Sequence, residues 1–114
     1  MKRSIKSNQR KLKVINLIAN AAGTALTGLD SSDQNISMTD TGTGVKTIEL
    51  GSSGFASADY IVQVTTATAD TVAQVSITDV NTFVINTFDS TDGTTAKDAI
   101  CHITVFGSDV TDRY

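Results

Sequence analysis

The two most reactive side chains of the sequence, its only cysteine and its only histidine, are neighbours at positions 101 and 102 in "DAICHITVFG". A thiol becomes an effective nucleophile when a base such as imidazole lies within hydrogen-bonding distance. Successive side chains of a β-strand point to opposite faces, so His102 cannot activate Cys101 of the same chain. We therefore expect Cys101 to be a small buried residue and His102 to lie on a sheet face. The sequence predicts no enzyme and no catalytic residue.

The acidic loops are the second place to look for chemistry, because Ca²⁺ is bound by several carboxylate and carbonyl oxygens that converge from one loop. The segment "DSTDGTTAKD" contains Asp89, Asp92 and Asp98, and "DSSD" contains Asp30 and Asp33. Neither has the D-x-[DN]-x-[DN]-G spacing of a calcium loop. Since Asp and Gly are common turn formers, the pattern favours turns and leaves the three acids of the first loop as weak calcium candidates. One His and one Cys are also too few for a zinc site, so no cofactor is expected.

The charges divide the chain into two parts. Residues 1–13, "MKRSIKSNQRKLK", contain six cations and no acid, whereas residues 14–114 contain three cations and all twelve acids. This predicts a basic N-terminal arm, residues 1–13, joined to one acidic domain, residues 14–114. Basic blocks often bind nucleic acid, but the acidic domain repels a polyanion and the arm has no aromatic residue on which a base could stack. The sequence therefore favours a protein partner over nucleic acid.

Beyond residue 35 the apolar residues tend to recur at every second position, which is typical of strands. In "DYIVQVTT" this places Tyr60, Val62 and Val64 on the core face, and "DVN" at 79–81 has the residues of a hairpin turn. The last strand, "DAICHITVFG", is the longest and is expected in mid-sheet. Strands are expected at 35–39, 44–50, 59–66, 71–78, 82–88 and 98–107. The predicted fold is all-β, an antiparallel sandwich or small barrel, Ig-like or jelly-roll-like, with an extended basic arm.

Residues 12–22, "LKVINLIANAA", allow two interpretations. A helix would gather four apolar side chains on one stripe, whereas a strand would alternate less cleanly. The strand is favoured because Val14, Ile15 and Ile18 are β-branched. No run in the chain approaches the roughly 18 apolar residues of a transmembrane helix, so no membrane span is expected.

The second half of the sequence resembles small β-sandwich modules in the virion proteins of tailed bacteriophages, which include capsid decoration (cement) proteins and fibre-type modules. The resemblance covers residues 59–107 and lies in the "TFVINT" strand, the Ser/Thr/Asp/Gly loop and the closing "ITVFG" strand. It implies a non-enzymatic structural protein of the virion that binds and stabilises the capsid surface. Its expected partners are the major capsid protein or another virion protein and further copies of itself, as a dimer or trimer. The alternative is a fibre or adhesin module that binds a receptor or glycan through the loop at 89–98.

The resemblance also suggests a mechanism for the basic arm. An extended segment can add its backbone to an exposed sheet edge of a capsid protein, while its Lys and Arg side chains pair with acids on that protein. The residues expected to contact the partner are the six cations and two apolar anchors, namely Lys2, Arg3, Ile5, Lys6, Arg10, Lys11, Leu12 and Lys13.

Overall fold

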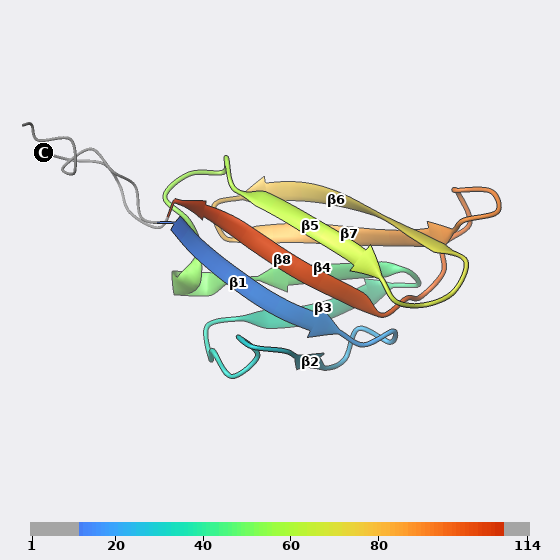
Figure 1. Ribbon diagram of the computed structural model, residues 1–114, viewed down its shortest axis with the longest axis horizontal. Helices are drawn as coiled ribbons and strands as arrows, with labels where there is room; N and C mark the ends of the chain where they lie inside the picture. The colour runs from blue at the N-terminus through green and yellow to red at the C-terminus, as the bar shows by residue number, and fades with distance from the viewer. Residues whose placement is uncertain (1–11, 109–114) are drawn as a thin grey trace, which may run out of the picture.

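The computed structural model describes residues 12–108, which form two antiparallel four-stranded sheets packed face to face (Figure 1). The all-β prediction is confirmed, and of the two expected architectures the chain adopts the sandwich. Residues 51–53 form a short 3-10 turn, η2 (Gly51–Ser53). No helix within residues 12–108 is long and apolar enough to cross a membrane.

The first sheet has the order β2, β1, β8, β5, and all its strand pairs are antiparallel. β8, the last strand within residues 12–108, lies in mid-sheet between β1 and β5, as expected. It is not the longest strand, because β6 has nine residues and β8 has eight. β2 was not predicted, because two residues are too short to show a pattern. The bounds of these strands are β1 (Leu12–Ala19), β2 (Leu26–Thr27), β5 (Ile61–Thr66) and β8 (Cys101–Ser108).

The second sheet has the order β3, β4, β7, β6 and is also antiparallel throughout. Val80 and Asn81 form the predicted hairpin turn between β6 and β7, where the Asn81 amide donates to Oδ1 of Asp79 at 3.0 Å. The bounds are β3 (Ser37–Gly42), β4 (Val45–Glu49), β6 (Thr71–Asp79) and β7 (Thr82–Asp89).

The core lies between the two sheets and follows the alternation of the strands. Tyr60 is buried and Val62 and Val64 pack against the core, as predicted for β5. Because both sheets contribute every second residue, the core is one continuous layer of mostly aliphatic side chains. Its fully buried hydrophobic members include Leu17, Ala19, Ile48, Leu50, Phe83, Ile85, Ala99, Cys101, Ile103 and Val105.

Residues 12–19 are a strand and not a helix, which decides the ambiguity of the N-terminal region. Leu12 and Lys13, the last two residues of the expected arm, pair with β8. Their partners are Ser108 and Gly107, so the first and last described residues lie side by side at one end of the sandwich. The loop between β7 and β8 lies at the opposite end (Figure 1).

Candidate docking surface

Three apolar side chains form a row across the outer face of the first sheet. Phe106 of β8 lies directly opposite Val14 of β1 on one side and Ile61 of β5 on the other. Val14 is 46% exposed, Ile61 is 50% exposed, and Leu12, two residues before Val14, is 70% exposed. We call Leu12, Val14, Ile61 and Phe106 the docking surface. Large aliphatic side chains this exposed on neighbouring strands are the kind of patch that marks an interaction site.

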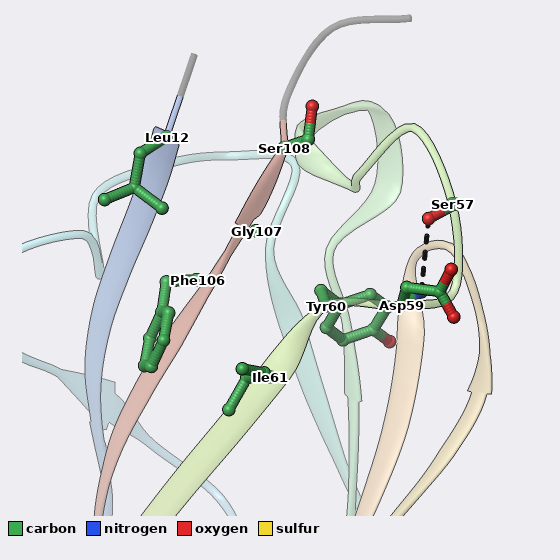
Figure 2. Close-up of a pocket in the computed structure, with 8 residues that line it drawn as sticks. All are labelled: Leu12, Ser57, Asp59, Tyr60, Ile61, Phe106, Gly107 and Ser108. Carbon is green, nitrogen blue, oxygen red and sulfur yellow. Dashed lines mark hydrogen bonds between the residues drawn. The ribbon is translucent and has the colours of Figure 1, made fainter. Parts of the chain in front are cut away.

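A pocket of about 390 Å³ opens along the edge of the docking surface. Figure 2 shows Leu12, Phe106 and Ile61 on three adjacent strands, with Tyr60 beyond them. The polar part of the lining comes from Ser57, Asp59 and Ser108, and the Asp59 amide donates to Oγ of Ser57 at 3.2 Å. The pocket thus combines an apolar wall with one carboxylate, which suits a segment that carries both apolar and cationic side chains.

Tyr60 gives the pocket a rigid wall. Its ring stacks on Phe55 with 4.7 Å between the ring centroids. Its hydroxyl lies 2.8 Å from the carbonyl oxygen of Asp79 and 3.0 Å from that of Thr82, so it can donate to either. Burial, reinforced by the nearby Asp79 carboxylate, raises the pKa of Tyr60 to about 12. The Tyr60 hydroxyl therefore stays uncharged at ordinary pH. It donates a hydrogen bond to the main chain and does not release its proton as an acid.

Lys13 points inward, away from the docking surface. Its ammonium donates to the carbonyl oxygens of Ser53 and Gly54 and lies 5.2 Å from the centroid of the Phe55 ring. It therefore has a structural role within its own chain that the sequence analysis did not predict.

Of the eight residues predicted to contact a partner, the structure describes only Leu12 and Lys13. Leu12 lines the pocket and is part of the docking surface. Whether Lys13 also contacts a partner stays a prediction. The other six, Lys2, Arg3, Ile5, Lys6, Arg10 and Lys11, lie outside the described residues.

Cys101 and His102 lie as the alternation predicts, with the thiol buried and the imidazole exposed on the outer face. Burial raises the pKa of the Cys101 thiol, and the neighbouring Lys46 ammonium only partly opposes this shift. The thiol is thus protonated at neutral pH and is a poor nucleophile.

The acids of the loop after β7 are turned toward their own loop. Asp89 accepts hydrogen bonds from the amide and hydroxyl of Thr91, and Asp92 accepts from the amides of Thr94 and Thr95. Asp98, the third calcium candidate, accepts from the amide of Gly44 at 2.7 Å, away from the other two. Within residues 12–108, no group of three or more His, Cys, Asp and Glu side chains is placed to hold a metal ion. The favoured interpretation of these acids as turn formers agrees with their hydrogen bonds.

Comparisons with protein-family models, with curated proteins and with solved structures gave no significant match. The docking surface must therefore be interpreted from its own chemistry. The sequence analysis did not single out Val14, Ile61 and Phe106. A signal was present, because these apolar residues occupy outward positions in strands whose inward positions are already apolar.

Proposed function

We propose that the chain is a non-enzymatic structural protein that docks on a larger assembly, as a decoration protein on the capsid of a tailed phage. The observation that carries this proposal is the position of the docking surface. Its exposed apolar residues lie at the end of the sandwich where the chain continues into the basic segment, and Leu12 belongs to both.

Two kinds of contact are then available, one from the apolar docking surface and one from the charges of residues 1–11. Covering Leu12, Val14 and Ile61 removes apolar area from water, which contributes about 25 cal/mol for each Å². The cations of residues 1–11 attract an acidic partner from a distance and speed the encounter. A partner that presents an apolar strip beside acidic residues would satisfy both.

The choice of a phage capsid as the assembly comes from the sequence resemblance over residues 59–107. A small sandwich whose outer face carries a docking surface at one end can cover a seam between capsid subunits without any catalytic group. The major capsid protein or another virion protein is the proposed partner.

The hydrogen bonds of the loop at 89–98 weigh against the alternative of a receptor- or glycan-binding module. Asp89 and Asp92 already accept five hydrogen bonds between them from Thr91, Thr94 and Thr95. A ligand that used these carboxylates would have to replace those bonds, so the loop is built for its own conformation.

The proposal is tested by adding the full chain to phage particles assembled without it and measuring the bound copies by sedimentation. Leu12→Ser combined with Ile61→Ser should weaken binding at least about tenfold, because each large aliphatic side chain contributes about 1.5–3 kcal/mol when covered. The matched control is Val72→Ser combined with Ile77→Ser on β6, whose side chains are also partly exposed.

Deletion of residues 1–11 should slow association and reduce its salt dependence. Failure of the wild-type chain to bind any particle would overturn the capsid proposal. Equal loss in the docking-surface variant and in the β6 control would show that the docking surface has no special role.

A further inference from the structure

We propose that the pocket beside the docking surface receives a lysine or arginine side chain of the partner, with the aliphatic stem on the apolar wall and the charged head at Asp59. This contact rests on the proposed function, since the partner is the assembly that covers the docking surface. The partner would then present one cation next to its apolar strip, in addition to the acids that attract residues 1–11.

The pocket joins the docking surface to a carboxylate. Three of its lining residues, Leu12, Ile61 and Phe106, belong to the docking surface, and the loop before β5 adds Asp59. Figure 2 shows Leu12 on one side of β8 and Asp59 on the other, with Phe106 and Ile61 between them. Lysine and arginine bury their aliphatic stems along apolar surface and keep the charged head among polar groups. The lining therefore matches both parts of such a side chain.

The carboxylate of Asp59 has no hydrogen-bond donor within residues 12–108. Seven of the ten acids in this range accept a hydrogen bond from elsewhere in the chain, whereas Glu49, Asp59 and Asp70 do not. Of these three, Asp59 is the one that lines the pocket. Its capacity to accept hydrogen bonds is therefore not used by the described part of the chain.

The lysines of the described residues do not neutralise Asp59 either. Lys13 donates inward to two main-chain carbonyls. Lys46 is 1% exposed and lies in the core. Lys97 belongs to the loop between β7 and β8, at the opposite end of the sandwich (Figure 1). Since residues 12–108 contain three lysines and no arginine, their own cations leave the charge of Asp59 open.

Covering the docking surface makes this open charge costly. A partner seated on Leu12, Ile61 and Phe106 also closes the mouth of the pocket and displaces water from the Asp59 carboxylate. A carboxylate that loses its water without gaining a cation or donors destabilises the complex. A lysine or arginine head removes this penalty through charge-assisted hydrogen bonds, while its stem covers the apolar wall. An apolar side chain would leave the charge unpaired, and an acidic one would be repelled.

The pocket is tested first without the partner, by NMR titration of the full chain with hexylammonium, hexanol and hexanoate, which share one alkyl chain. Hexylammonium should shift the amide signals of Asp59, Ile61 and Gly107. It should bind about two- to fivefold more tightly than hexanol, the range of a partly exposed ion pair, and hexanoate should bind most weakly. Asp59→Asn should abolish the preference for the cation. The matched control is Glu49→Gln on β4, outside the pocket, which should keep it.

Two results of this titration would overturn the inference. The first is equal binding of hexylammonium and hexanol to the wild type. The second concerns the basic segment of the chain itself, residues 1–11, whose NMR signals should be the same in the wild type and in Asp59→Asn. A change in those signals would show that the chain's own cations occupy the pocket. Circular dichroism checks that each variant is folded.

Binding to phage particles then tests the side chain of the partner. Asp59→Lys should weaken binding about tenfold or more, because it sets two cations against each other in a covered site. Glu49→Lys makes the same change of charge on the outer face of the second sheet and should leave binding unchanged. Unweakened binding of Asp59→Lys to particles that bind the wild type would overturn the inference alone. Failure of the wild type to bind would instead overturn the proposed function.

Discussion

The ammonium of Lys13 lies 5.2 Å from the centroid of the Phe55 ring and joins the first strand to the loop behind the pocket. The same ammonium donates to the carbonyl oxygens of Ser53 and Gly54 at 2.6 and 2.9 Å. These carbonyls belong to the last residue of η2 and to the residue after it, where main-chain acceptors have no helical partner. The last cation of the basic stretch therefore holds the segment from which Phe55 supports Tyr60.

Replacing Lys13 should loosen this support. Lys13→Met keeps most of the apolar stem but removes two charge-assisted hydrogen bonds and the cation–π contact, so the free energy of unfolding should fall by about 1–3 kcal/mol. Urea denaturation measures the change. The control is Lys97→Met, which removes one long, exposed hydrogen bond of 3.4 Å to the Ala69 carbonyl and a weak attraction to the exposed Asp89 carboxylate. It should change stability by less than about 0.5 kcal/mol. Equal effects of the two variants would contradict the assignment.

Replacing Lys46 by methionine should have the opposite effect and raise the free energy of unfolding. It is 1% exposed, and the hydrogen-bond acceptor of its ammonium within residues 12–108 is the carbonyl oxygen of Ala99, at 3.0 Å. A buried charge without a carboxylate partner does not recover its desolvation cost, so Lys46→Met should stabilise the fold by about 1–3 kcal/mol. Lys46→Ala is the counterpart, because its cavity should destabilise the fold by about 2–5 kcal/mol. Thermal and urea unfolding compare the three chains, and a clear loss of stability in Lys46→Met would refute the argument.

Much of the sandwich could be predicted from alternation alone. In β5 and β8 the inward positions are apolar and several outward positions are polar, so Tyr60 and Cys101 were assigned to the core correctly. The sequence of β1 was compatible with a helix or a strand because Val14 and Ile18 on its outer face are as apolar as the buried residues on its inner face. The feature that obscured the strand pattern is thus part of what makes the docking surface.

Contacts between distant segments could not be predicted in this way. Lys46 shares the inward alternation of Ile48, but its acceptor at Ala99 lies 53 residues further along the chain. The row formed by Val14, Phe106 and Ile61 likewise depends on the strand order, which joins segments from both ends of the sequence. The alternation of apolar and polar residues predicts which side chains of a strand point to the core and which point outward. Which strands lie side by side depends on the order of the strands in the sheet.

Gly107 should be intolerant of even a small side chain. A Cβ at this position would lie 2.8 Å from Cβ of Tyr60 and 3.1 Å from Cδ1 of Phe55. Gly107→Ala should therefore displace the Tyr60 wall and destabilise the fold by about 1–3 kcal/mol. The exposed Ser76→Ala on β6 is a control that should change little. Unfolding by urea measures both, and an unchanged midpoint for Gly107→Ala would mean that the strands separate easily at this end.

The loop after β7 should depend on the ionised form of Asp92. Hydrogen bonds from the hydroxyl and amide of Thr95, followed by the amide of Thr94, lower the pKa of Asp92 from 3.8 to about 2. A carboxyl whose pKa is lower in the folded chain stabilises it above the unfolded pKa, and this contribution is lost as the pH falls from about 4 through about 2. In NMR titrations the Asp92 carboxyl should thus have a midpoint near 2, and the shifts of the Thr94 and Thr95 amides should follow it. Asp92→Asn should remove this titration from the Thr94 and Thr95 signals, and a midpoint at or above 3.8 in the wild type would show that the carboxylate does not hold the loop.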